Sequence, residues 1–315
     1  MRRLDIKRHL VPADVAAVGE LLRVAERADG HKALDDHRWL DMAQGGRESF
    51  AGLVAWESGH DHPVAYAQVS RGTRSWALDL VVDPHHRYDA LTIGPEMLDA
   101  ALDVVAREGG GHVHLWVHQP TAAHDAIADA VGLGRGRDLL QLRRPLPVEH
   151  EPFDLPLRAF RPGEDEEAWL AVNNRAFDWH PEQGGWDLET LQAREAEPWF
   201  DPEGFLLTER DGRLEGFCWT KVHADHDPPL GEIYVIAADP EAGRKGLGRA
   251  LVLAGLDWLA GRGLPVGMLY VDAGNTKAVK LYDSLGFSLD HVDRAYVGDV
   301  GPQPTPDTPR ADPTA

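Results

Sequence analysis

The apolar and polar positions of this chain follow one order twice, which predicts a duplicated α/β unit. Apolar, β-branched runs predict strands at 76–82 and 232–238. Each strand ends at an Asp-Pro pair, Asp83-Pro84 in the first half and Asp239-Pro240 in the second. A turn and a segment of helical periodicity follow each pair, so the two pairs align the halves residue by residue.

The later elements also repeat in order. The predicted helices at 95–107 and 250–262 lead to strands at 112–117 and 267–271, and each half then has a helix and a glycine turn. Upstream strands are predicted at 50–56, 63–70, 204–209 and 213–221. The tandem pattern predicts an α/β (α+β) fold of two domains, each a mixed, mostly antiparallel sheet flanked by helices.

A Pro-rich and acidic stretch separates the two halves and predicts the domain boundary. We expect an N-terminal domain over residues 1–145, a linker over 146–156, and a C-terminal domain over 157–300. Residues 301–315 contain five prolines and little apolar surface, which predicts a disordered tail.

Composition excludes several classes of protein. The net charge of −20 and the pI of about 5.1 argue against a nucleic-acid partner. The single cysteine, Cys218, excludes an internal disulfide framework and fits a reducing cytosol; its apolar strand predicts a buried thiol. Because neither a signal sequence nor a membrane-spanning run is evident, we expect a cytoplasmic monomer without a membrane partner.

A glycine-rich turn lies between the strand at 232–238 and the following helix. It reads Gly243-Arg244-Lys245-Gly246-Leu247-Gly248. Such a turn leaves backbone N–H groups free at a helix N-terminus, where the helix dipole favours anions. The basic residues Arg244, Lys245 and Arg249 either meet ligand phosphates or form an ordinary solvated patch.

This turn, followed by Asn275 and by Tyr282-x-x-x-Gly286-Phe287, resembles the GCN5-related N-acetyltransferase family. The pyrophosphate loop of that family usually begins with Arg or Gln, whereas Gly243 stands here. The resemblance implies acetyl-CoA as co-substrate and no metal, since the histidines show no ligand spacing. It implies cofactor contacts from Ile236, Ala237, Ala238, Gly243, Arg244, Lys245, Gly246, Leu247, Gly248, Arg249, Asn275 and Lys280, and from Leu80, Val81 and Val82 of the first half.

Acetyl transfer to an amine requires a base for the amine and a proton for the departing thiolate. Glu232, where the second strand begins, is the candidate base, because an α-amine with a pKa of roughly 7.7–8.0 is easily deprotonated by a carboxylate or its water. Tyr282 is the candidate acid, because a phenol pKa of about 10 exceeds that of a thiol. The alternatives are a solvated carboxylate and a packed aromatic ring.

The first half lacks this pair of groups. Aligning the Asp-Pro pairs puts Trp76 opposite Glu232, and aligning the glycine turns puts Ala128 opposite Tyr282. The loop at 85–94 has also lost the closely spaced glycines. We therefore expect the first half to be a non-catalytic scaffold and one wall of the substrate site.

Strings at 172–177, 180–186 and 219–223 resemble a tandem-domain actinobacterial member of the same family. This resemblance implies a small-molecule substrate: acetylation of the cysteine amine of cysteinyl-glucosaminyl-inositol. The implied acceptor contacts are Asp36, Glu182, Lys221, Glu232 and Tyr270. Carboxylates and a lysine suit an acceptor rich in hydroxyl groups. Glu182 is alternatively a loop carboxylate, and Lys221 a strand-edge charge.

Two other functions stay open at this point. One is acetylation of another small amine, such as an aminoglycoside or a polyamine. The other is a non-catalytic acyl-CoA sensor, which the pairing of Glu232 with Tyr282 disfavours. Release of coenzyme A with varied amines distinguishes the three.

Overall fold

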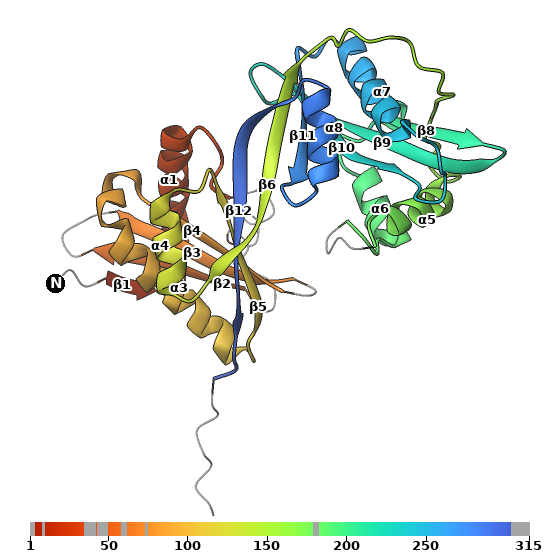
Figure 1. The fold of residues 1–315 in the computed structure, drawn as a ribbon. Helices are drawn as coiled ribbons and strands as arrows, with labels where there is room; N and C mark the ends of the chain where they lie inside the picture. Colours follow the sequence, from red (N-terminus) through yellow and green to blue (C-terminus); the bar gives the residue numbers. More distant parts are fainter. Residues whose placement is uncertain are drawn as a thin grey trace, which may run out of the picture. The chain divides into compact units, whose positions relative to one another are not determined.

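The computed structural model describes residues 4–7, 10–34, 42, 50–57, 62–72, 75–178 and 183–303 (Figure 1). The chain forms two compact units, one of Met1–Asp138 with Val292–Ala315 and one of Leu139–His291. The predicted boundary at 146–156 differs from this division because two strands, β6 (Gly134–Pro145) and β12 (Ser288–Val300), each run from one unit into the other. Residues predicted for the tail lie outside the described part from 304 on.

The first unit is built on a mixed sheet, as predicted. Its strands lie in the order β1, β2, β3, β4, β5, β12 and β6. Strands β4 and β5 are parallel, and β12 pairs antiparallel with β5 from Asp293↔His118 to Val300↔Gly111. The bounds are β1 (Leu4–Lys7), α1 (Pro12–Asp29), β2 (Phe50–Glu57), β3 (Pro63–Arg71), β4 (Trp76–Val82), the 3₁₀ helix η1 (Pro84–Asp89), α3 (Ala90–Arg107), β5 (Gly111–His118) and α4 (Ala122–Ala130).

Alternating residues of the strands bury both faces of this sheet. Leu53, Ala65 and Leu78 pack in one apolar cluster with Met97 and Leu98 of α3. The intervening residues of the same strands join α1 in a second cluster: Val54, Tyr66 and Val81. Helices α3 and α1 therefore cover opposite faces of the first sheet.

The second unit repeats this plan. Its strands lie in the order β6, β11, β10, β9, β8 and β7, and β10 is parallel to β11. The bounds are β7 (Arg158–Ala159), α5 (Glu166–Ala176), α6 (Leu188–Glu195), the 3₁₀ helix η2 (Pro202–Gly204), β8 (Phe205–Arg210), β9 (Arg213–His223), β10 (Leu230–Ala238), α7 (Leu247–Gly261), β11 (Val266–Asp272) and α8 (Thr276–Ser284). Both units thus have the mixed, mostly antiparallel sheet that the sequence predicts.

The faces of the second sheet are covered in the same way. Cys218, Ile233 and Leu269 pack in a cluster with residues of α7 and α8. Phe217 and Trp219, on either side of Cys218, pack with residues of α5 and α6 on the other face. Burial raises the pKa of the Cys218 thiol to about 12, so this cysteine is a packed apolar side chain, as predicted.

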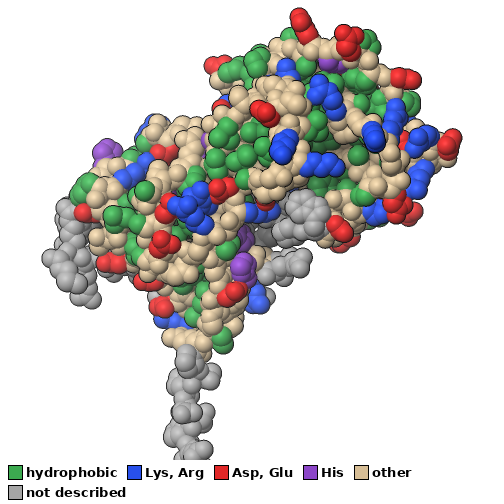
Figure 2. All heavy atoms as spheres, in the orientation of Figure 1, with side chains coloured by type: hydrophobic (Ala, Val, Ile, Leu, Met, Phe, Trp, Pro, Cys, Tyr) green, Lys and Arg blue, Asp and Glu red, His purple; other side chains and the backbone are tan. Residues whose placement is uncertain are grey.

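Surface features add two observations. On the face drawn in Figure 2, acidic and basic side chains are interspersed over both units. No helix among the described residues is long and apolar enough to cross a membrane.

Asp239, which directly follows β10, is a buried carboxylate held by charged hydrogen bonds. It accepts from Arg175 at 2.7 Å and from Arg213 at 3.1 Å. Burial alone would raise its pKa, but the bonds from Arg175, the Glu241 amide and Arg213 hold the pKa below its usual value. A lowered pKa contributes stability that is complete above the unfolded pKa of about 3.9 and is lost as the pH falls through the folded value.

We expect Asp239→Asn to lower the Tm at pH 7 by roughly 3 °C, because the amide keeps the shape of the side chain but loses its charge. Thermal unfolding of both proteins from pH 7 down to about pH 3 measures the effect. The difference in Tm should shrink as the carboxylate is protonated. An undiminished difference at low pH would show that packing, not charge, is lost.

Candidate active site

Strands β10 and β11 part after their first four residues. Their pairing runs only from Leu230↔Val266 to Ile233↔Leu269, whereas β10 stays paired with β9 as far as Ala238↔Gly216. Within the described residues, the end of β10 therefore presents backbone N–H and C=O groups that no strand on the β11 side satisfies. An exposed strand edge of this kind binds an extended chain through main-chain hydrogen bonds. The predicted cofactor contacts Ile236, Ala237 and Ala238 all lie on this segment.

The predicted glycine loop follows directly on this edge. Gly243 and Gly246 have φ of 62° and 79°, the left-handed region where a side chain is strained. Gly246 is the N-cap of α7 and contributes no capping side chain. The first-turn N–H groups of α7, which include those of Leu247 and Gly248, are thus left for water or a ligand. This geometry is that of an anion site.

Gly248 lies in the first turn of α7 with open space beside it. An added Cβ would meet only the Leu281 side chain, at 3.9 Å. We expect Gly248→Ala to stabilise the free protein by about 0.5–1 kcal/mol, because alanine has the higher helix propensity. If a phosphate approaches this backbone, the same methyl group should raise the KM for acetyl-CoA by about tenfold or more.

Thermal unfolding and steady-state kinetics of the Gly248→Ala protein measure the two effects together. Gly261, at the far end of the same helix, has nothing within 4 Å of an added Cβ, so Gly261→Ala is the matched control. An unchanged KM in the Gly248→Ala protein would place the ligand elsewhere.

The basic residues around the loop differ in their contacts. Arg244 donates to the Asp154 carbonyl at 2.8 Å and lies 3.8 Å from Glu215, so it has a structural role. Arg249 donates to Ser284 Oγ at 3.2 Å, and Lys245 is exposed. Lys280 is exposed on α8, and Asn275 caps that helix by accepting from the Ala278 amide at 3.2 Å. Asn275 is thus the N-cap of α8.

Glu232 lies near the start of β10 and is only 6% exposed. Its Oε2 is 2.7 Å from Nε2 of His223, the last residue of β9. Sequence reasoning missed this histidine, because the contact is diagonal across two strands and depends on their register. The only signal was its position two residues after Lys221, on the same face of β9.

Three predicted acceptor contacts share one face of the sheet. Glu232 and Lys221 are directly opposite each other on β10 and β9. Tyr270 of β11 lies between Leu269 and Val271, which both face α7 and α8, so Tyr270 points to the opposite face. The other two predicted contacts, Asp36 and Glu182, lie outside the described residues.

The surroundings of these side chains are aromatic and polar. The Lys221 ammonium lies 4.6 Å from the ring centroid of Trp199 and 5.6 Å from that of Tyr234. The Tyr270 side chain is 40% exposed, and its hydroxyl accepts from Gln141 Nε2 at 2.6 Å. The face around Glu232 therefore offers a carboxylate, an ammonium, a phenol and flat apolar rings.

Tyr282 lies on the other side of the sheet. It extends from α8, is 7% exposed, and packs in the cluster of α7 and α8 with its ring 5.7 Å from that of Phe287. Burial, and to a lesser extent Cys218, raises its pKa, so the phenol stays protonated. Glu232, next to Ile233 of this cluster, and Tyr282 therefore lie on opposite faces of the second sheet.

Strands β4 and β5 of the first unit also part, but this unit has Trp76 and Ala128 at the positions of Glu232 and Tyr282. Strand β4 pairs with β5 only from Trp76↔Val113 to Leu78↔Leu115, which leaves Leu80, Val81 and Val82 on an edge like that of β10. The indole of Trp76 is buried and donates to the Gly110 carbonyl, and Ala128 is buried. In place of a glycine loop, η1 joins β4 to α3.

Comparison with known proteins gives one consistent result. The family model described as acetyltransferase (GNAT) family matches residues 167–287, which hold the glycine loop, Glu232 and Tyr282. A mycothiol acetyltransferase of Acidimicrobium ferrooxidans is 49% identical over 280 residues, 87% of this chain and 90% of that protein. The mycothiol acetyltransferase of Thermobispora bispora is 45% identical over 93% of this chain and 98% of its own length.

Solved structures share the fold. A GCN5-related N-acetyltransferase from Sphaerobacter thermophilus superposes with a TM-score of 0.69 at 22% identity, over 95% of this chain and 96% of that one. A tandem GNAT protein from the clavulanic acid biosynthesis pathway gives a TM-score of 0.66 at 15% identity, over 96% and 100%. At these identities the likeness concerns architecture alone.

Proposed function

This chain belongs to the mycothiol acetyltransferases, within the GNAT family, and we propose that it transfers the acetyl group of acetyl-CoA to the cysteine amine of cysteinyl-glucosaminyl-inositol, completing mycothiol. Acetyltransferases of this family use acetyl-CoA as co-substrate. The observation that carries the proposal is the opening between β10 and β11, with the unpaired edge of β10 leading to the glycine loop and Glu232 beside the opening.

Binding of acetyl-CoA follows from the backbone. The amides of the pantetheine arm complete the hydrogen bonding of β10 over Ile236–Ala238. The diphosphate lies at the first turn of α7, where the amides of Leu247 and Gly248 and the helix dipole face it. Lys245 and Arg249 add positive charge from the exposed side, and Arg244 stabilises the loop. This arrangement brings the thioester to the opening between the strands.

The acceptor amine approaches from the face that carries Glu232. Glu232 takes a proton from the ammonium group, directly or through one water, and the amine attacks the acetyl carbonyl. His223, 2.7 Å from the carboxylate, fixes its orientation and lies on the route by which the proton leaves toward solvent. Glu232 passes its proton toward solvent past His223, and the attacking nitrogen then loses its second proton by the same route. The tetrahedral intermediate collapses as the carbon–sulfur bond breaks.

Tyr282 acts from the opposite face. Its buried neutral hydroxyl donates a proton to the departing thiolate of coenzyme A. The two proton transfers therefore take place on opposite sides of one sheet, and the acetyl group lies between them. Because of this separation, Tyr282 cannot transfer its proton directly to Glu232.

The acceptor's sugar and inositol rings lie over the polar and aromatic face beside Glu232. Lys221 and Tyr270 hydrogen-bond hydroxyl groups, and the Trp199 ring offers a flat apolar surface. The first unit supplies neither the base nor the acid, because Trp76 and Ala128 take their positions. The second unit alone carries out the chemistry.

The test is a product assay with the purified full-length chain. Acetyl-CoA is incubated with cysteinyl-glucosaminyl-inositol, glucosaminyl-inositol, free cysteine, an aminoglycoside or a polyamine, and products are identified by mass. Acetylation of the first acceptor far above the others supports the proposal. Preference for the aminoglycoside or the polyamine would identify that amine, and not cysteinyl-glucosaminyl-inositol, as the acceptor. Tight binding of acetyl-CoA without transfer to any amine would identify a sensor.

A further inference from the structure

The first unit carries a cluster of histidines at a position where the second unit has arginines. Asp83 directly follows β4 as Asp239 directly follows β10, and both carboxylates are buried. Asp239 is neutralised by two arginines, Arg175 and Arg213. Asp83 instead accepts hydrogen bonds from histidine rings, which carry no permanent charge.

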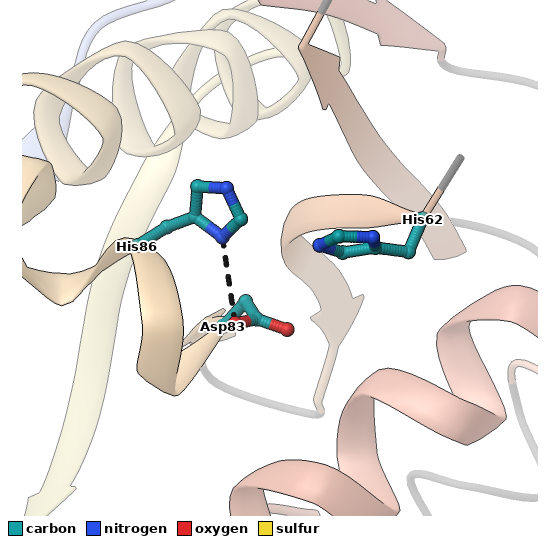
Figure 3. A group of neighbouring side chains, drawn as sticks. All are labelled: His62, Asp83 and His86. Atoms are coloured by element: carbon teal, nitrogen blue, oxygen red, sulfur yellow. Dashed lines mark hydrogen bonds and ion pairs between the residues drawn. The ribbon is translucent and has the colours of Figure 1, made fainter. Parts of the chain in front are cut away.

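Three side chains of this cluster converge on one point (Figure 3). His62 immediately precedes β3, Asp83 follows β4, and His86 belongs to η1. One ligand atom from each lies within 4.8 Å of the other two. His86 Nδ1 is 3.4 Å from the Asp83 carboxylate, and the centroids of the two imidazole rings are 5.5 Å apart.

The carboxylate is buried and held in place. Asp83 Oδ1 accepts from the His85 amide at 2.7 Å, and the Asp83 amide donates to the Val64 carbonyl at 3.0 Å. The Asp83 side chain is only 6% exposed, and His85 Nδ1 lies 3.1 Å from its Oδ1. A buried anion between two imidazoles favours a cation there.

The donor set selects the kind of cation. Two imidazole nitrogens and one carboxylate oxygen bind Zn²⁺ at about 2.0–2.2 Å and leave a fourth position for water. Ligand atoms of a tetrahedral zinc site are then roughly 3.3 Å apart, so the group must contract by up to about 1.5 Å to bind the ion. Ca²⁺ and Mg²⁺ prefer oxygen ligands and fit poorly.

We propose that His62, Asp83 and His86 form a binding site for one divalent transition-metal ion of the Zn²⁺ class. The ion would join the start of β3 to η1, and η1 occupies the place that the glycine loop has in the second unit. In the first unit, the bound metal would cross-link β3 to η1 where the second unit has its glycine loop. Sequence spacing did not reveal this set, because its members come from two connections that only folding brings together.

The test uses untagged full-length protein that has been dialysed against a chelator and then titrated with Zn²⁺ by calorimetry, with bound metal counted by mass spectrometry. Two other groups of possible ligands, one containing His118 and one containing His226, also lie within 4.8 Å and would confuse the count, so every protein carries His118→Ala and His226→Ala. We expect one Zn²⁺ per chain, and a rise in Tm when the metal is bound.

Separate variants assign the site. His62→Ala and His86→Ala should each weaken Zn²⁺ binding by at least about tenfold and abolish the rise in Tm. His85→Ala is the matched control, because that ring touches the same carboxylate but is 79% exposed and outside the group. If His86→Ala fails to fold, Co²⁺ replaces Zn²⁺ in the parent protein as a second readout. Co²⁺ bound at a site with imidazole ligands absorbs visible light, and His62→Ala should abolish this absorption. Absence of saturable binding, or equal binding by all variants, overturns the proposal, and neither result depends on acetyl transfer.

Discussion

Replacing Glu232 by glutamine is expected to lower kcat by about 10²–10³-fold with little change in the KM for acetyl-CoA. Glutamine has the same shape and can still bond His223, so the fold is kept, but the amide cannot take a proton from the amine. General base catalysis contributes about 10²–10⁴-fold, which sets the size of the effect. Steady-state rates with the product identified by mass measure it.

Two companion variants sharpen this test. Glu189→Gln removes an exposed carboxylate of α6 and should leave kcat unchanged. His223→Ala should lower kcat in the wild type but add little to Glu232→Gln, because a residue that acts through Glu232 has no further effect once the carboxylate is gone. If the losses of kcat in the two single variants add in the double variant, His223 has a role independent of Glu232. A near-wild-type kcat for Glu232→Gln would show that Glu232 is not the catalytic base.

Replacing Tyr282 by phenylalanine is expected to lower kcat by about 10–10²-fold, because the thiolate then leaves without its proton. The ring of Tyr282 is packed against Phe287 in an apolar cluster, so phenylalanine keeps this packing and the Tm should not fall. Single-turnover measurement of coenzyme A release separates the chemical step from product release.

The control for this experiment lies on the opposite face of the sheet. Tyr270→Phe removes the hydroxyl that accepts from Gln141 and should raise the KM for the acceptor with a smaller effect on kcat. If Tyr282→Phe instead behaves like Tyr270→Phe, or like the wild type, Tyr282 is a packed aromatic ring, the alternative weighed from the sequence.

The repeated strand order and the glycine loop could be read from the sequence because they depend on local patterns. The Asp-Pro pairs at 83–84 and 239–240 end their strands as predicted, and Gly243 and Gly246 adopt the conformations for which glycine is needed. The predicted helix at 250–262 begins earlier, at Leu247, because Gly246 rather than an apolar period defines its N-cap. The sequence was therefore sufficient to predict the structure where a single residue determines the local backbone conformation.

Features that depend on register could not be read in this way. The contact of Glu232 with His223 is diagonal, so predicting it requires the register of β9 and β10. The separation of β10 from β11 is not marked by any particular residue type in the sequence. The same holds for His62 and His86, which approach each other through two connections of the first unit. Periodicity assigns a side chain to a face but does not name its neighbour.

Strand β12 has a consequence for biosynthesis. Residues 293–300 complete the first sheet beside β5, yet they are translated only after the whole second unit, Leu139–His291. Until they emerge, the edge of β5 that faces β12 has no strand partner from this segment, and an open strand edge is a site of mispairing. The first sheet therefore cannot be completed until the second unit has been translated, so the order of translation and the order of assembly differ in this protein.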